Sequence, residues 1–387
     1  MSIIGTIISV MLMTLILNIV FKKFNILIDQ TSVSNHKSFI SGHKTIPLSG
    51  GLVFFLVLIF FLPENYKYLN ILFFFIFLIG LLSDLNILHS PTLRIIFQIT
   101  IIILYLLLFD NFVSSIRIDF FDDLLNVFFI KLLFTLFCIL VLINGTNFTD
   151  GVNTLVIGYF ILVFSNILYL SNLHNFDLDI SLVSICLISL LAIYIFNFFG
   201  KMFLGDGGSY LISFVAGITL IKFFNDNYLI SPYYIMALLW YPAYENLFSI
   251  VRKKIQKKTP STPDSRHLHQ LIFLYLYKSF KIEKNLSNLL SGIIICLYNL
   301  FYFFIIFDSY FYTATLVYSV FFNVFNKFIV PMNRLEIQTN DLFYHLHKQF
   351  LVKLGIIKTS HVRGPTMLPD PISQSEIDEM IELMSNK

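Results

Sequence analysis

Residues 203–209 (Phe-Leu-Gly-Asp-Gly-Gly-Ser) join two long apolar runs and place one ionisable side chain, Asp206, among three glycines. A carboxylate beside apolar runs of membrane-spanning length is costly unless a partner pairs with it. Glycines let backbone N–H groups approach an anion closely, and a carboxylate can hold a Mg²⁺ ion that itself binds phosphate. The segment therefore indicates a metal-bridged phosphate site at a membrane surface, although a tight turn with an exposed Asp needs the same residues.

Two polar segments nearer the N-terminus also suit phosphate chemistry. Lys44 lies just before a Pro-Leu-Ser-Gly-Gly stretch and suits a phosphate or a sugar, although a positively charged membrane anchor needs the same residue. Asp84 ends an apolar run, and Arg94 follows a Ser-Pro pair ten residues later. The carboxylate suits a base or a metal neighbour and the guanidinium suits a phosphate clamp, although the start of an ordinary helix is the plainer interpretation.

Two more clusters lie near residues 150 and 267. Asp150 and Asn153 are three residues apart, and we expect their oxygens on one face of a helix N-terminus. Arg266, His267 and His269 form Arg-His-Leu-His, which suits a diphosphate, although His-x-His alone is typical of a solvated surface. Zinc is disfavoured because no Cys lies nearby and the Asp and Gly clusters favour Mg²⁺, or Mn²⁺ in its place.

The composition of the chain sets the class of protein that must position these residues. The 387 residues are 57% hydrophobic and only 13% charged, with a mean hydropathy of +0.80, which excludes a soluble globular protein. The three cysteines lie inside apolar runs and suggest no disulfide framework. We therefore predict an all-α polytopic membrane protein that binds a lipid bilayer and no nucleic acid.

The apolar runs predict eleven transmembrane spans, the second and third of which are short for a full crossing. The first run has no cleavage site after it, so it is predicted to be a retained span and not a signal peptide. The predicted spans are 2–21, 49–62, 69–83, 94–109, 128–145, 152–170, 181–199, 207–224, 232–250, 287–307 and 310–330.

The distribution of positive charge predicts the orientation of these spans. On this scheme 22 of the 26 Lys and Arg residues fall on one side, which leaves only Lys67, Arg117, Lys131 and Lys222 on the other. The positive side of a membrane protein is the cytoplasmic side, so the N-terminus is predicted outside and the C-terminus in the cytoplasm. All the polar clusters then lie in the cytoplasmic loops, which are 22–48, 84–93, 144–151, 197–206 and 251–286.

This one-sided arrangement favours an enzyme over a transporter, because a transporter needs polar groups near the middle of the membrane. The predicted spans contain few such groups, among them Asn18, Asn166 and Asn299. Residues 1–330 are predicted to form the transmembrane catalytic domain. Residues 331–387 lose the hydrophobicity and are predicted to form a cytoplasmic tail.

Five motifs follow one another in a fixed order, and this order carries a resemblance. They are Pro-Leu-Ser-Gly-Gly, an Asp with Ser-Pro-x-x-Arg after it, Asn-x-x-Asp-Gly-x-Asn, Phe-Leu-Gly-Asp-x-Gly-Ser and Arg-His-Leu-His. Over roughly residues 30 to 275 the chain resembles the polyprenyl-phosphate N-acetylhexosamine-1-phosphate transferases of glycosyltransferase family 4. Enzymes of this family begin the synthesis of bacterial polysaccharides, O-antigen and teichoic acid.

The resemblance implies a reaction between a nucleotide-sugar and a lipid. A lipid phosphate, such as undecaprenyl phosphate, attacks the β-phosphate of a UDP-N-acetylhexosamine, UMP leaves and a polyprenyl-diphospho-sugar forms. Mg²⁺ screens the phosphates so that one anion can approach another. The family is expected in the bacterial plasma membrane, and a homodimer is compatible with the sequence.

The resemblance also implies a role for each matching residue. It assigns metal binding to Asp206 with Asp150, and catalytic roles to Asp84, Asp150, Asp206, His267 and His269. It assigns substrate binding to Lys44, Arg94, Asn153, Asn197, Phe203 and Arg266, with Phe203 stacked on uracil.

The chain departs from the family pattern at four positions. The first residue of the family's Asp-Asp pair is Ser83 here, the second acidic position near the nucleotide is Asn153, the Gly that usually follows is Thr154 and the last His is Gln270. These departures predict a divergent branch with an altered donor or acceptor. A muramoyl-pentapeptide donor, a non-catalytic scaffold and a lipid-linked-sugar transporter remain as alternatives.

Overall fold

The computed structural model describes residues 3–28, 46–255 and 267–307, and within these ranges every regular element is a helix. In chain order they are α1 (Ile3–Phe24), α3 (Gly50–Phe61), the 3₁₀ helix η1 (Glu64–Tyr66), α4 (Lys67–Asp84), α5 (Pro91–Phe109), α6 (Asp119–Leu125), α7 (Phe128–Thr149), α8 (Leu155–His174), α9 (Ile180–Phe198), α10 (Gly205–Asp226), α11 (Pro232–Leu238), α12 (Trp240–Ile255), α13 (Leu268–Ser279) and α14 (Lys284–Phe307).

Seven of the described helices are long and apolar enough to cross a membrane, so the prediction of an all-α, multi-pass membrane protein is confirmed. They are α1, η1 continued by α4, α5, α7, α8, α9 and α10. The third predicted span is longer than expected, at 21 residues from Glu64 to Asp84. The total of eleven stays a prediction, and the span at 310–330 and the tail at 331–387 lie outside the described residues.

The predicted span 232–250 is wrong as a single helix, because the structure divides it into α11 and α12 at Leu239. Pro242 has no backbone N–H with which to continue the helical bond to the carbonyl of Leu238. The hydroxyl of Tyr159 takes this place and donates to Leu238 O at 2.5 Å. A buried tyrosine therefore satisfies the carbonyl that the break leaves without its helical partner.

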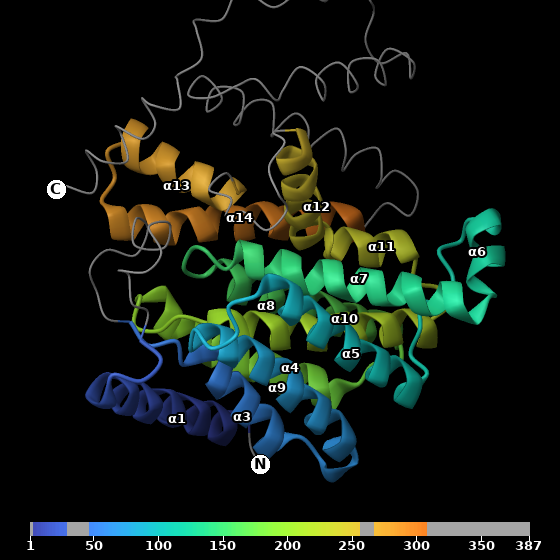
Figure 1. Ribbon diagram of the computed structural model, residues 1–387, viewed down its shortest axis with the longest axis horizontal. Helices are drawn as coiled ribbons and strands as arrows, with labels where there is room; N and C mark the ends of the chain where they lie inside the picture. The colour runs from blue at the N-terminus through green and yellow to red at the C-terminus, as the bar shows by residue number, and fades with distance from the viewer. Residues whose placement is uncertain (1–2, 29–45, 256–266, 308–387) are drawn as a thin grey trace, which may run out of the picture. The chain divides into compact units, whose positions relative to one another are not determined.

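The chain divides into two compact units, one of residues 1–251 and 260–313 and the other of residues 252–259 and 314–387. Helix α10 is the centre of the first unit, where it packs against α3, α4, α7 and α8 (Figure 1). Along an 18-residue stretch of α10, 94% of the residues are buried, whereas only 28% are buried along stretches of the same length in α1 and α5. The helix that begins with the Asp206 motif is therefore the core of this unit.

Two glycine pairs bring the backbone of α10 against its neighbours. A Cβ on Gly51 of α3 would lie 2.3 Å from the amide nitrogen of Gly208, and one on Gly80 of α4 would lie 2.4 Å from the Cα of Gly207. Neither position has room for a side chain, so glycine allows α3 and α4 to contact the first turn of α10 directly.

The asparagines that the sequence places inside spans pair with other segments. Asn18 accepts a hydrogen bond from Ser49, Asn166 from Tyr234 and Asn299 from Trp240. These polar groups therefore join segments of the fold, as buried polar groups must find partners.

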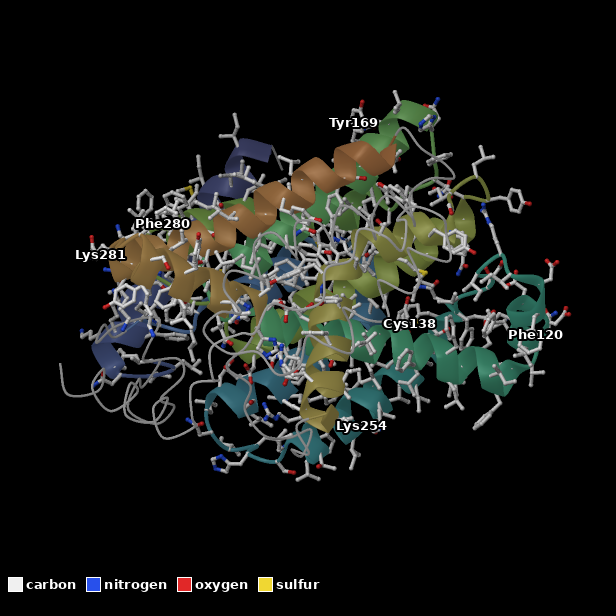
Figure 2. The ribbon with its side chains drawn as sticks, turned by 90° about the horizontal axis from the view of Figure 1, so that it is seen from above. Phe120, Cys138, Tyr169, Lys254, Phe280 and Lys281 are labelled. Atoms are coloured by element: carbon white, nitrogen blue, oxygen red, sulfur yellow. The ribbon has the colours of Figure 1, made fainter. Side chains whose placement is uncertain are left out.

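The polar segments of the chain gather at one end of the helices. Figure 2 shows Phe280 and Lys281, between α13 and α14, at the opposite end from Phe120 of α6. Hydrogen bonds tie the end of α4 and the end of α7 to the start of α10. That all the polar clusters lie on one face of the membrane, and on which side, stays a prediction.

We expect Gly80→Ala to destabilise the protein by about 1–3 kcal/mol, because the new methyl group would overlap the backbone of Gly207. Gly217→Ala is the matched control on α10, since the nearest atom to a Cβ there is the mobile end of the Leu142 side chain at 3.2 Å. Thermal unfolding of the detergent-purified protein measures both. Equal melting temperatures for the two variants would contradict the close approach of α4 and α10.

Candidate active site

The N-terminus of α10 is held by a carboxylate at the end of α4. Asp84 Oδ1 accepts the backbone N–H of Asp206 at 2.9 Å, and its Oδ2 accepts that of Gly207 at 3.1 Å. The first N–H groups of a helix have no intrahelical partner, and the helix dipole favours an anion there. Gly205 has a φ of +78°, and a Cβ there would lie 2.6 Å from Asp84 Oδ2, so both the backbone conformation and the contact require glycine.

The Asp206 carboxylate is contacted by side chains from three other helices. Its Oδ2 accepts from Ser83 Oγ at 2.7 Å and from Arg94 Nη1 at 3.2 Å, and its Oδ1 accepts from Asn147 Nδ2 at 2.8 Å. Arg94 Nη1 also donates to Ser83 Oγ at 2.7 Å. Both members of the ion pair remain partly exposed, at 21% for Arg94 and 17% for Asp206, so a solvent-borne ligand can reach them.

The position of Arg94 follows from the start of α5. Ser90 caps this helix, with its Oγ accepting from Leu93 N at 3.4 Å, and Pro91 occupies the first helical position, where its missing N–H is not needed. Arg94 lies in this first turn, close to the end of α4. The Ser-Pro helix start is therefore present and places Arg94 beside Asp206, while the role of Arg94 as a phosphate clamp stays a prediction.

Asn147 was not among the predicted site residues, although it lies in the predicted polar segment 144–151. It is in the last turn of α7, and besides Asp206 its amide contacts Ser209 Oγ at 3.2 Å. The sequence offered one signal for Asn147. It lies three residues before Asp150, so the two polar side chains fall close together at the end of an otherwise apolar helix.

The structure corrects the prediction that Asp150 and Asn153 share one face of a helix N-terminus. Helix α7 runs on through Thr149, Asp150 is the residue that caps its C-terminus, and α8 begins only at Leu155. Asn153 lies in the turn between the two helices, where its backbone N–H donates to Asn288 Oδ1 at 2.8 Å. The apolar run hid the turn because α7 continues further than the hydrophobicity does.

The Phe203 segment pairs with the Pro-Leu-Ser-Gly-Gly segment through the backbone. Phe203 N donates to Pro47 O at 2.9 Å, and Gly50 N donates back to Phe203 O at 3.0 Å. The half-buried Phe203 ring is thus attached to the start of α3. Two motifs that lie about 150 residues apart in the sequence therefore form one local structure.

Asn197, predicted near the nucleotide-sugar, is buried and connects two turns. Its Oδ1 accepts from Thr154 N at 2.6 Å and its Nδ2 donates to Met202 O at 2.9 Å. Both ends of the amide are engaged by the backbone, so in this structure Asn197 orders the segment that leads to Phe203.

A second polar group surrounds the start of α13. His267 caps this helix, and its Nδ1 lies 2.8 Å from Oε2 of Glu245, a residue of α12 that the sequence reading did not single out. The signal was present, because an ionisable residue inside an apolar run is unusual. His269 is fully buried, and neither of its ring nitrogens has a hydrogen-bond partner among the described residues. Burial, with His267 as a second cause, lowers the pKa of His269 well below its usual value.

The residues present fit a divalent cation that is shared with a substrate. Within the described residues no three His, Cys, Asp or Glu side chains group to form a metal cage. Mg²⁺ commonly needs only one or two protein carboxylates, because phosphates and waters complete its shell. Asp206 Oδ1 accepts a hydrogen bond from Asn147 and retains a lone pair, so it suits this role. Lys44 and Arg266 lie outside the described residues.

We expect Asp84→Asn to lower the free energy of unfolding by about 1–3 kcal/mol, because the amide nitrogen cannot accept either N–H group of α10. Asp226→Asn makes the same substitution at the exposed C-terminal end of α10, where a negative charge is unfavourable, and should be neutral or slightly stabilising. Thermal unfolding compares the two. A neutral result for Asp84→Asn would show that the carboxylate does not hold the helix.

Comparison with known proteins relates this sequence to one family of enzymes. Residues 66–224 match the sequence model described as glycosyl transferase family 4. An undecaprenyl-phosphate alpha-N-acetylglucosaminyl 1-phosphate transferase of Thermotoga maritima is 27% identical over 254 residues, which cover 64% of this chain and 77% of the relative. The protein of the same name from Escherichia coli K12 is 31% identical over 147 residues, covering 36% of this chain and 39% of the relative.

The matched segment contains the core of the candidate site, with Ser83, Asp84, Arg94, Asn147 and Asp206. A probable enzyme of the same kind from Bacillus subtilis is 26% identical over 134 residues, covering 34% of this chain and 37% of the relative. With the E. coli and B. subtilis proteins the alignment thus spans less than half of either sequence. Residues 66–224 thus match the model of glycosyl transferase family 4, and the chain is an enzyme of the phosphotransferase class.

Proposed function

We propose that this enzyme transfers an N-acetylhexosamine-1-phosphate from a UDP-sugar to undecaprenyl phosphate, which yields a polyprenyl-diphospho-sugar and UMP. The observation that carries the proposal is the convergence of side chains from α4, α5 and α7 on the Asp206 carboxylate. This convergence lies inside the segment that matches the family, and the relatives are named as transferases that act on undecaprenyl phosphate.

In this reaction the protein must neutralise charge and orient the two phosphates, and it does not need to supply a base. An oxygen of the lipid phosphate attacks the β-phosphorus of the donor, the bond from that phosphorus to the bridging oxygen breaks, and UMP leaves with the bridging oxygen. The lipid phosphate is already largely ionised near neutral pH, so no proton has to be removed first. The Arg94 guanidinium, beside Asp206, is suited to accept the charge of a phosphate group.

Asp206 is the residue proposed to hold Mg²⁺, with Ser83 and Asn147 fixing the orientation of its carboxylate. The ion would neutralise part of the phosphate charge and so allow one anion to approach another. Asp84 acts through α10 in this proposal, because its two oxygens accept the backbone N–H groups of Asp206 and Gly207. Phe203, Asn153, Lys44 and Arg266 remain proposed contacts of the nucleotide-sugar.

The cellular setting is part of the same proposal. The excess of Lys and Arg on one side supports a bacterial plasma-membrane protein with an outer N-terminus and a cytoplasmic C-terminus. The site would then face the compartment that holds nucleotide-sugars, at the depth of the lipid phosphate. The product would begin the synthesis of a cell-envelope polysaccharide.

We expect purified protein to release UMP from UDP-N-acetylglucosamine only when undecaprenyl phosphate and Mg²⁺ are both present, and Asp206→Asn to lower the rate at least about 100-fold. Asp226→Asn, at the other end of the same helix, should keep the wild-type rate. Turnover of a different UDP-amino sugar would correct the donor and keep the chemistry. UMP release that is independent of lipid, or undiminished in Asp206→Asn, would refute the proposal.

Arg94 and a metal ion on Asp206 Oδ1 would repel each other, because the guanidinium lies 3.2 Å from Oδ2 of the same carboxylate. We therefore expect Arg94→Gln to bind Mn²⁺ several-fold more tightly than the wild type in the absence of donor, while its KM for the UDP-sugar rises. Electron paramagnetic resonance of free Mn²⁺ measures the first effect without any turnover. Unchanged Mn²⁺ affinity would show that the ion does not bind at Asp206.

A further inference from the structure

Glu245 is a buried carboxylate to which the proposed reaction assigns no role. It lies in α12 and is only 2% exposed. Its Oε1 accepts the backbone N–H of Leu268 at 2.8 Å, and its Oε2 lies 2.8 Å from Nδ1 of His267. A buried carboxylate is costly unless its oxygens are paired, and here both oxygens have a partner.

The two contacts together determine where the proton of His267 lies. The backbone N–H of Leu268 can only donate, so Oε1 must accept. If Oε2 carries no proton it can also only accept, and the contact with His267 is then a hydrogen bond in which Nδ1–H donates. Nε2 is then the ring nitrogen left for a ligand, and no described residue is hydrogen-bonded to it.

The ring of His267 is also held from its faces. Phe148 of α7 stacks at a centroid distance of 5.5 Å, and His269 lies nearly parallel at 5.7 Å. The backbone N–H of His267 donates to Gln270 Oε1 at 3.0 Å, which fixes the start of α13. The ring contacts thus help to orient the imidazole, and Glu245 contacts the nitrogen, Nδ1, whose protonation is in question.

Among the described residues, no carboxylate is hydrogen-bonded to the neighbouring histidine, His269. His269 is fully buried, and a Cβ on Gly151 would lie 2.2 Å from its Nε2, so the ring packs against a glycine backbone. Among the described residues, a carboxylate pairs with the ring of His267 and none is hydrogen-bonded to the ring of His269.

We propose that Glu245 is a positioning residue that keeps a proton on His267 Nδ1, so that the ring can carry a positive charge while Nε2–H is presented to a phosphate oxygen of the nucleotide-sugar. The role of the phosphate rests on the proposed function, whereas the arrangement of Glu245 and His267 stands on the geometry alone.

Glu245→Gln is the informative variant because an amide has only one acceptor oxygen. If that oxygen keeps the bond to Leu268 N–H, the amide nitrogen faces Nδ1 and donates to it, which reverses the tautomer and disfavours the charged ring. Glu245→Asp keeps two acceptors on a shorter side chain. It serves as the second variant in case Glu245→Gln does not fold.

The experiment combines kinetics with histidine NMR on the full chain in lipid nanodiscs. UMP release is measured for wild type, Glu245→Gln, His267→Gln and the double variant, and ¹⁵N-histidine spectra report the protonation of Nδ1, with His267→Gln assigning the signal. We expect Glu245→Gln to lower kcat/KM for the UDP-sugar about 10- to 100-fold, as for carboxylates behind metal-bound histidines. We expect the double variant to be no slower than His267→Gln alone.

Each outcome decides the matter. A His267 signal with Nδ1 protonated in the wild type and unprotonated in Glu245→Gln, together with non-additive rates, supports the proposal. Losses that multiply in the double variant show that Glu245 only stabilises the fold, and an unchanged ¹⁵N signal shows that it does not set the tautomer. If the wild type releases no UMP, the proposed function fails, while the NMR comparison still tests the Glu245–His267 pair.

Discussion

The hydrogen bonds from the first turn of α10 to Asp84 are the interaction on which the rest of the site depends. They join the end of one helix to the start of another, so that two segments about 120 residues apart share one carboxylate. A helix N-terminus packed among other helices needs acceptors for its first N–H groups, which have no intrahelical partner. Because Asp84 meets this need, the neighbouring Asp206 side chain can be directed toward ligands.

The same arrangement explains how the chain works with Ser83 where the family has an aspartate. A second carboxylate 2.7 Å from Asp206 Oδ2 would repel it, whereas the hydroxyl donates to Asp206 and accepts from Arg94 at the same time. The substitution therefore leaves an ordered network with its own counter-ion. This network differs from a damaged site, in which buried polar groups would lack partners.

The class of fold could be predicted from the sequence, because membrane-length apolar runs are a local signal. The sequence-based prediction missed the break at Leu239, although Pro242 was a local signal for it; the hydroxyl of Tyr159 that satisfies the freed carbonyl comes from a distant helix. It also missed Asn147 and Glu245, whose importance comes only from what they contact. Asp150 and Asn153 were placed on the wrong element because the hydrophobicity of α7 ends before the helix does. Partners in space, unlike periodicity, cannot be read from one chain.

The glycine contacts of α10 bear on how a long lipid reaches the site. Where the backbones are in direct contact the helices cannot move closer together, so the spacing of α3, α4 and α10 is fixed at these glycines. In the proposed reaction these three helices would therefore not part to admit the lipid, whose phosphate would meet the site at the start of α10, a part of the fold that cannot shift to accommodate it.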